Sequence, residues 1–318
     1  MAGGAGRRFR MAGGRGDKAL FEVEGKPMVA RVVEAASQVA SEVVVVVDTP
    51  MKAERYRAAL GGARVVVDDE GPRGPLTGIR TGLKALSSSE CLVVPCDVPF
   101  MKVGVLERLI DRLRRGVSGV VPLWPGGAHE PLIAAYRRDE ALEISLLLGR
   151  LGRARPDDLL RAGLEVEFMP ISEIRDVDPS LESFINVNRP GDLSRRPPRL
   201  VGEARAVRLR PPTPPLATAK LVEEAMARGW PSLADEAGVP FWSAMLRRGL
   251  STKPLDLIEA SRWHEAEADE YGRLGLKLLR ARALIDAHRC LEEVGVHEER
   301  LFEEALRTYR EVGIERKG

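Results

Sequence analysis

Three apolar runs of this chain end in an aspartate, at Asp48, Asp68 and Asp97. Asp97 lies between two prolines in PCDVPF, and a rigidly held carboxylate is an oxygen ligand of the kind that Mg²⁺ prefers. A single Asp after a strand is also typical of a turn or a helix N-cap. For Asp97 the surrounding motif favours a metal ligand. For Asp48 the cap is an equally good interpretation, because DTP precedes a helical segment.

The chain begins with the glycine-rich segment MAGGAGRRFRMAGGRGDK. Gly3, Gly4 and Gly6 lack side chains, so their backbone N–H groups can approach a polyphosphate closely. Arg8 would contact the phosphates as a planar fork and Lys18 as a mobile point charge. On composition alone, a disordered Gly/Arg terminus is the better interpretation. The glycine segment therefore predicts a phosphate site only together with the motifs that follow it.

Residues 27–193 alternate between β-branched runs and helical segments, which predicts a doubly wound, mostly parallel α/β sheet with helices on both faces. Ligands bind such sheets beyond the carboxyl ends of the strands, so the three aspartates are expected on one rim. The expected strands are residues 41–50, 63–69, 91–97, 117–123, 163–171 and 183–188.

The composition changes near residue 195, where two Pro- and Arg-rich stretches follow. They predict a linker over 196–216, because proline is unsuited to regular structure. Residues 217–318 carry helical periodicity and predict an all-α domain of unknown role. We therefore expect an α/β domain over 1–195 and a separate helical domain after the linker.

The overall composition excludes several classes of protein. The net charge of +2 argues against an extended nucleic-acid-binding surface. Apolar runs are too short for a membrane span, and Gly and Arg occupy the place of a signal-peptide core. Three cysteines without metal-ligand spacing favour a reduced, cytoplasmic location.

Further candidates come from residues that are rare or placed before helices. Asn186 and Asn188 are the only asparagines of the chain, and Asn is disfavoured in strands, so we expect them to contact a ligand. Gly74 and Pro75 would begin a helix whose free N–H groups and positive dipole lie near a base or sugar, although ordinary helices also begin this way. His129 beside Glu130 predicts either an acid–base pair or, better, an ordered loop.

Six motifs occur in one order: AGGAGRRF, GDKAL with GKPM, GPLTGI, PCDVPF, HEPLIAAY and FINVNRPGDL. The series resembles the molybdenum cofactor guanylyltransferases, which are nucleotidyltransferases with a Rossmann-like sheet. The resemblance covers residues 1–195 and does not extend to the helical region.

The resemblance implies a role for each matching residue. Asp48 would contact base or ribose, Asp68 would face the guanine, and Asp97 would bind the metal. Asn186 and Asn188 would lie near the pterin substrate. The remaining implied nucleotide-binding and catalytic residues are Ala2, Gly3, Gly4, Gly6, Arg8, Lys18, Gly74 and Pro75.

One departure from the family concerns the first strand. In the family a hydrophobic strand leads into the glycine loop and forms the middle of the sheet, whereas here Met1 and Ala2 alone precede Gly3. MAGG recurs at Met11, but too few residues separate that copy from Lys18. The sequence thus predicts an open position in the middle of the sheet, with a translation start upstream of Met1.

Together these features predict a Mg²⁺-dependent enzyme that transfers GMP from GTP to molybdopterin and releases pyrophosphate. The alternatives are a GTP:adenosylcobinamide-phosphate guanylyltransferase and a non-catalytic, nucleotide-binding regulatory protein. No nucleic-acid or membrane partner is expected. The C-terminal helices are expected to mediate either self-association or contact with a protein partner.

Overall fold

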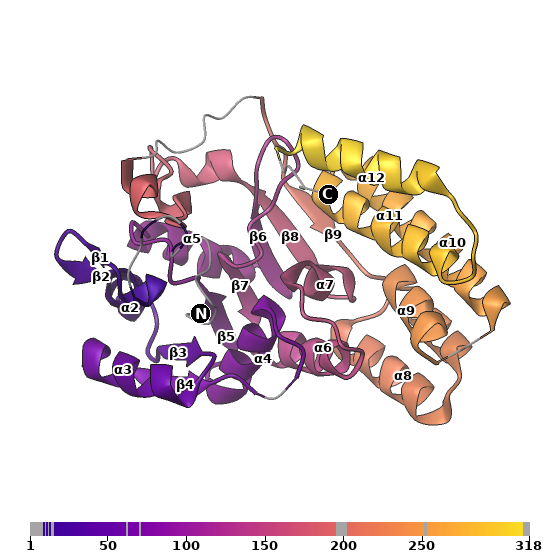
Figure 1. Ribbon diagram of the computed structural model, residues 1–318, viewed down its shortest axis with the longest axis horizontal. Helices are drawn as coiled ribbons and strands as arrows, with labels where there is room; N and C mark the ends of the chain where they lie inside the picture. The colour runs from indigo at the N-terminus through magenta and orange to yellow at the C-terminus, as the bar shows by residue number, and fades with distance from the viewer. Residues whose placement is uncertain are drawn as a thin grey trace.

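The computed structural model describes residues 9, 11, 13, 16–61, 63–69, 71–194, 202–250 and 253–313. The predicted site residues Ala2, Gly3, Gly4, Gly6 and Arg8 lie outside these ranges. Figure 1 shows an α/β part on one side and a group of helices, α8 to α12, on the other.

The strands form a mixed sheet that is interrupted in the middle. β3 and β4 form a parallel pair, and a second sheet has the order β5-β7-β6-β8-β9. β6 and β8 are parallel, and β5 runs the same way because both β5 and β6 are antiparallel to β7. A short antiparallel hairpin joins β1 and β2. The strands are β1 (Glu22–Val23), β2 (Lys26–Pro27), β3 (Val44–Val47), β4 (Arg64–Val67), β5 (Glu90–Val93), β6 (Gly119–Leu123), β7 (Ala134–Arg137), β8 (Val166–Pro170) and β9 (Val207–Leu209).

Helices surround these strands and continue to the C-terminal end of the described chain. The α-helices are α2 (Met28–Ser37), α3 (Pro50–Leu60), α4 (Pro75–Ala85), α5 (Val103–Leu113), α6 (Arg138–Arg150), α7 (Pro156–Arg161), α8 (Pro215–Arg228), α9 (Pro240–Leu250), α10 (Pro254–Arg273), α11 (Lys277–Glu292) and α12 (Glu299–Glu311). Short 3-10 helices are η1 (Lys18–Leu20), η2 (Ile171–Ile174), η3 (Glu182–Phe184), η4 (Pro190–Ser194) and η5 (Pro231–Ala237). In the described part of the chain, none of the helices is long and apolar enough to cross a membrane.

The predicted α/β class is confirmed, and five of the six expected strands are present. The expected strand at 183–188 is wrong, because these residues form η3 and an irregular segment. Its Val187 N–H donates to the carbonyl of Asp97 at 2.8 Å, which fixes the segment beside the end of β5 without a ladder of strand bonds. β7, which the sequence analysis missed, adds the antiparallel pairing within the sheet.

The predicted open position lies between β3 and β5. Each strand pairs on its other edge, β3 with β4 and β5 with β7. A cavity of about 420 Å³ separates them, lined by side chains of β3 and β5 together with α2, α4 and α5. Within the described ranges, neither strand has a partner strand on the edge facing this cavity.

The helical region is joined to the sheet more closely than the sequence predicts. The expected linker over 196–216 contains β9, which pairs antiparallel with β8. One apolar cluster runs from α4 and β6 into α9, α11 and α12. Within it Trp242 is fully buried and donates its indole N–H to the carbonyl of Ala162 at 2.8 Å. The linker is therefore partly regular structure, and the helices that follow share the core of the α/β part.

Candidate active site

Lys18, Asp97 and Asn188 meet at the carboxyl end of β5, although 79 and 170 residues separate Lys18 from its two partners. The Lys18 ammonium donates to Asp97 Oδ2 at 2.6 Å and to Asn188 Oδ1 at 2.8 Å. The Lys18 and Asp97 side chains are 17% and 20% exposed, so solvent and a ligand can reach them. The structure thus brings together a cation, a carboxylate and an amide that the sequence analysis selected separately.

Lys18 is held by a residue that the sequence analysis missed. Asp17 is the N-cap of η1, and its Oδ1 accepts from the backbone N–H of Ala19 at 3.1 Å. The same oxygen accepts from the hydroxyl of Tyr56 on α3 at 3.0 Å. Burial and the charge of Asp17 raise the pKa of Tyr56, so the hydroxyl stays a donor. Asp17 therefore fixes the backbone of Lys18 against α3.

A second missed residue holds Asn188. Asp192 Oδ2 accepts from the backbone N–H groups of both Asn188 and Arg189 at 2.8 Å. This side-chain-to-backbone pattern is typical of Asp in tight turns, and the Asp of NRPGD was its signal in the sequence. Asn186 is partly buried in the same segment, and its contact with a substrate stays a prediction.

Asp48 and Asp68 follow the parallel strands β3 and β4, as predicted. Asp48 Oδ1 is 2.7 Å from the Lys52 ammonium. The helix-cap interpretation of Asp48 is wrong, because Thr49 is the N-cap of α3 and its hydroxyl accepts from the Lys52 N–H at 3.3 Å. Asp48 is therefore a charged group on the rim that pairs with Lys52.

Asp68 carries a buried oxygen with unused hydrogen-bonding capacity. Its Oδ1 has no partner among the described residues. Burial raises the pKa of Asp68, and the nearby charges of Asp48 and Asp69 raise it further. A ligand N–H donor would satisfy this oxygen and stabilise the carboxylate.

The N-terminus of α4 differs from the expectation. The Leu76 N–H donates to the carbonyl of Ala154 at 3.1 Å, and the Thr77 N–H donates to the carbonyl of Gly74 at 3.1 Å. Pro75 has no N–H. The N–H groups of Leu76 and Thr77 in this first turn are therefore not free as expected, and the binding of nucleotide by Gly74 and Pro75 stays a prediction.

Gly74 is required here by a close approach of the chain. A Cβ at this position would lie 2.5 Å from the carbonyl oxygen of Ala154. Its φ of 167° is ordinary extended backbone, so the constraint is steric. The start of α4 thus rests directly on the segment between α6 and α7.

His129 orders its loop, in agreement with the second interpretation of its motif. Its Nε2 lies 3.0 Å from Asp157 Oδ1 in a buried contact. Glu130 Oε1 accepts from the indole N–H of Trp124 at 2.9 Å. Burial raises the pKa of Glu130, and the charge of Asp97 contributes to the shift. Trp124 packs edge-on against Phe184 of η3, with ring centroids 5.6 Å apart, so this loop contacts the segment that leads to Asn188.

The donor set fits a hard divalent cation. Among the residues that the structure describes, no cluster of three or more His, Cys, Asp or Glu side chains forms a closed metal cage. Asp97 and Asn188 instead direct two oxygen atoms at one point, where they bind the Lys18 ammonium. Mg²⁺ is commonly held by one or two carboxylates with substrate phosphates and water, so Asp97 is a suitable ligand.

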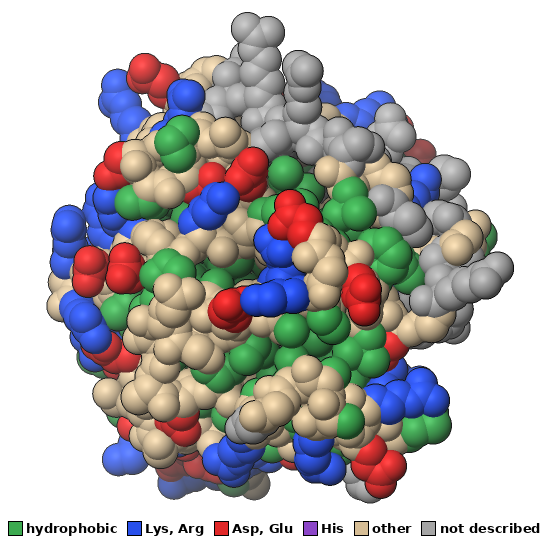
Figure 2. Space-filling view, turned by 90° about the vertical axis from the view of Figure 1, so that its left-hand side faces the viewer, with side chains coloured by type: hydrophobic (Ala, Val, Ile, Leu, Met, Phe, Trp, Pro, Cys, Tyr) green, Lys and Arg blue, Asp and Glu red, His purple; other side chains and the backbone are tan. Residues whose placement is uncertain are grey.

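Charges of both signs surround this part of the molecule. Figure 2 shows Lys, Arg, Asp and Glu side chains interspersed around apolar ones on the face that it displays. Neither sign dominates that face, in keeping with the net charge of +2. The local arrangement of cation and carboxylate at Lys18 and Asp97 suits a polyphosphate with a bound cation.

Comparison with protein families assigns the α/β part. The model of the MobA-like NTP transferase domain matches residues 1–165, which is more than half of the 318 residues. The chain belongs to this family. The family resemblance inferred from the motifs is thereby confirmed, and the chain is a nucleotidyltransferase.

Individual relatives agree with the family match. A probable molybdenum cofactor guanylyltransferase of Methanosarcina acetivorans is 33% identical over 213 residues, covering 64% of this chain and 90% of the relative. A molybdenum cofactor guanylyltransferase of Desulfosudis oleivorans is 32% identical over 197 residues, covering 61% of this chain and 91% of the relative. The crystal structure of molybdopterin-guanine dinucleotide biosynthesis protein A from Archaeoglobus fulgidus is 28% identical with a TM-score of 0.52, covering 60% of this chain and 92% of that protein.

These matches do not account for the helical region of this MobA-like chain. The family match ends at residue 165, ahead of β9 and of all helices from α8 onward. The matched segments span almost the full length of these relatives, but they leave more than a third of this chain unmatched.

Proposed function

We propose that this chain transfers GMP from GTP to molybdopterin, forming the guanine dinucleotide cofactor and pyrophosphate. The observation that carries the proposal is the convergence of Lys18, Asp97 and Asn188 at the carboxyl end of β5. Relatives that are 33% and 32% identical are named molybdenum cofactor guanylyltransferases, which supports molybdopterin as the acceptor and GTP as the nucleotide. Mg²⁺ as the metal and the cytoplasm as the location belong to the same proposal.

In the proposed reaction, an oxygen of the terminal phosphate of molybdopterin attacks the α-phosphorus of GTP. The bond between this phosphorus and the oxygen that bridges to the β-phosphate breaks, and its electron pair leaves with pyrophosphate. Such a transfer needs positioned reactants and electrostatic stabilisation more than covalent help from the protein. Mg²⁺, which Asp97 would hold, supplies positive charge that offsets the charge on the phosphate oxygens.

Each residue has a task that its environment supports. Lys18 stabilises the departing pyrophosphate, together with Arg8 and the backbone of the glycine segment. Asp68 accepts hydrogen bonds from guanine through Oδ1, which has no partner among the described residues, because guanine presents N–H donors on one edge. Asn188 contacts both Lys18 and the acceptor side, and Asn186 is expected to assist it.

The test measures pyrophosphate release with Mg²⁺ and each of GTP, CTP, ATP and UTP, with and without molybdopterin. We expect release that requires GTP and molybdopterin together. Asp97→Asn and Lys18→Met should each lower kcat by about 100-fold or more, the typical effect of removing one group that stabilises a transition state. Lys26→Met is the matched control, because Lys26 forms an exposed pair with Glu34.

Other outcomes would contradict the proposal in distinct ways. Turnover with adenosylcobinamide phosphate and none with molybdopterin would contradict the acceptor. Release with CTP in preference to GTP would contradict the nucleotide. Failure to bind any nucleotide would contradict the enzymatic role and favour the regulatory alternative.

A further inference from the structure

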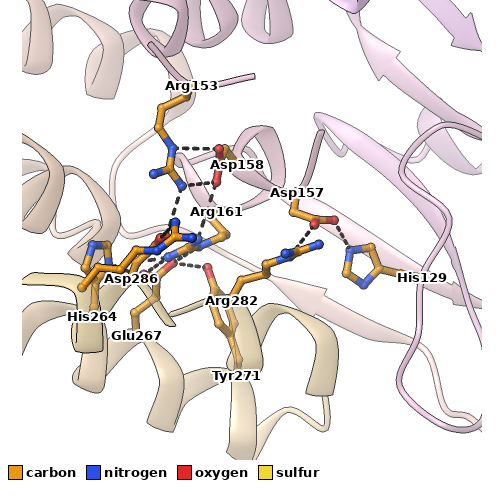
Figure 3. Close-up of polar contacts among 11 residues, drawn as sticks. His129, Arg153, Asp157, Asp158, Arg161, His264, Glu267, Tyr271, Arg282 and Asp286 are labelled. Atoms are coloured by element: carbon orange, nitrogen blue, oxygen red, sulfur yellow. Dashed lines mark hydrogen bonds and ion pairs between the residues drawn. The ribbon is translucent and has the colours of Figure 1, made fainter. Parts of the chain in front are cut away.

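A buried network of charged side chains joins the helical region to the α/β part (Figure 3). Its members come from the loop before β7, from α7 and the segment leading into it, and from α10 and α11. The residues labelled in Figure 3 are His129, Arg153, Asp157, Asp158, Arg161, His264, Glu267, Tyr271, Arg282 and Asp286. The network connects helices that lie outside the family match at residues 1–165 to loops of the α/β part.

The first connection begins at Asp286 of α11. Its Oδ2 accepts from Arg153 Nη2 at 3.1 Å and from Arg161 Nη1 at 2.8 Å. Arg153 also donates from Nε and Nη2 to the two oxygens of Asp158, at 2.8 and 2.7 Å. Asp286 is 1% exposed; burial alone would raise its pKa, but the charges of Arg161 and Arg153 lower it. α11 therefore anchors both ends of the segment 153–161 through ionised groups.

This segment in turn holds the start of α4. Ala154 directly follows Arg153, and its carbonyl accepts the Leu76 N–H at 3.1 Å. The absence of a side chain at Gly74 allows this carbonyl to approach, since a Cβ there would be 2.5 Å away. A displacement of Arg153 would consequently be passed to Gly74 at the rim where the nucleotide is proposed to bind.

The second connection begins one helical turn earlier on α11. Arg282 Nε donates to Asp157 Oδ2 at 3.1 Å, and Asp157 Oδ1 contacts His129 Nε2 at 3.0 Å. Burial alone would raise the pKa of Asp157, but the interactions with His129 and Arg282 lower it to about 2. His129 is followed by Glu130, which accepts from the indole N–H of Trp124, and Trp124 packs edge-on against Phe184 of η3.

The start of α11 touches the same loop directly. The Leu278 N–H lies 3.5 Å from the carbonyl of Gly127. A Cβ at Gly127, whose φ is +84°, would be 2.9 Å from the carbonyl oxygen of Gly275. Glycine is therefore required for the loop to rest on the turn that precedes α11.

We infer that α11 is a positioning element of the nucleotidyl-transfer site, with Asp286 and Arg282 as positioning residues. Asp286 acts through Arg153 on the start of α4, and Arg282 acts through Asp157 on the loop Trp124–Pro131. The inference rests on the proposed function for what the site does. Its physical basis is that a displacement of about 1 Å in the residues that support a catalytic site lowers the rate of a transfer reaction about 100-fold.

The test uses the full chain with Asp286→Asn and Arg282→Met. Hydrogen exchange should increase at least several-fold in residues 72–80 of the first variant and in residues 124–131 of the second. Because the start of α4 is proposed to bind nucleotide, Asp286→Asn should raise KM for GTP at least 5-fold. Arg282→Met should lower kcat at least 5-fold, because its loop packs on the segment that leads to Asn188. These fold-changes are on the order of 1 kcal/mol.

The matched control is Glu293→Gln, which breaks an exposed pair with Arg248 at the end of the same helix and should change none of these quantities. Arg282→Lys should restore most of the kcat, since it keeps the positive charge opposite Asp157. Local exchange that stays at the wild-type level in both folded variants would overturn the inference. So would activity that falls only in proportion to the folded fraction, with KM unchanged.

The proposed function can fail separately. If the wild type releases no pyrophosphate with GTP and molybdopterin, that function is wrong, whereas the exchange of residues 72–80 and 124–131 still decides whether α11 holds the two loops. If the variant Asp286→Asn does not fold, Arg282→Met still decides whether α11 positions the loop Trp124–Pro131, because Arg282 is at the partly exposed edge of the network, 20% exposed.

Discussion

Glu267 of α10 provides a quantitative test of the buried network. It is 2% exposed, and its two oxygens accept from Arg161 Nε at 2.7 Å and Nη2 at 2.8 Å. The hydroxyl of Tyr271 donates to Oε1 at 2.9 Å. Glu267→Gln keeps the shape of the side chain while it removes the charge opposite Arg161. The perturbation therefore isolates one buried ion pair.

The expected loss follows from the pKa of Glu267. Burial alone would raise this pKa, but the charge and hydrogen bonds of Arg161, with the hydrogen bond from His264, lower it from 4.5 to about 2. A pKa lower in the folded than in the unfolded chain contributes stability above pH 4.5 that is lost as the pH falls through about 2. At about 1.4 kcal/mol for each factor of ten in proton affinity, the contribution is about 3 kcal/mol at pH 7.

The assay is urea unfolding of wild type and Glu267→Gln at pH 7 and at pH 3.5. The variant should be less stable by about 3 kcal/mol at pH 7 and by about 2 kcal/mol at pH 3.5, where part of the contribution is already lost. Glu34→Gln is the control, because the exposed pair of Glu34 and Lys26 contributes at most about 1 kcal/mol. A loss below about 1 kcal/mol at pH 7, or a difference that grows toward acid, would refute the reasoning.

Two further predictions concern packing. Gly82→Ala should stabilise the chain by about 1 kcal/mol, because Gly82 lies inside α4 and the new Cβ would meet Val46 Cγ2 at an ordinary 3.5 Å beside the cavity between β3 and β5. A lower urea midpoint for this variant would contradict that argument. Trp242→Phe should cost about 1–3 kcal/mol, because the carbonyl of Ala162 loses its buried indole donor. An unchanged midpoint would show that this carbonyl finds another partner.

The sequence predicted those parts of the fold whose signals are local. β3 is four consecutive valines, and a β-branched run with turn residues at both ends specifies a buried strand without further context. β7 was missed because Ala134–Arg137 carries no β-branched residue, so its strand form depends on the neighbouring β5 and β6. The strand predicted over residues 183–188 does not form. Their alternating pattern is typical of a strand, but in the described part of the chain no strand pairs with them.

The candidate site divides in the same way. Lys18, Asp97 and Asn188 could be selected from motif and residue type, because phosphate and metal chemistry restricts the side chains that serve it. Asp17 and Asp192 were not selected, since each acts on backbone N–H groups of its neighbours and a turn Asp by itself indicates only a turn. Gly74 was selected for free N–H groups, whereas its described contact is with Ala154 of a distant segment.

The sequence by itself thus determined the α/β class, the helical character of the C-terminal region and the chemical types at the site. Tertiary structure alone decided how the two regions are joined. Arg161 and Glu267 are 106 residues apart. From the sequence alone, each could equally well have formed an ion pair on the surface. Folding buries them together, and a buried charge is tolerated only with a partner, so the location of the pair is a property of the packed chain.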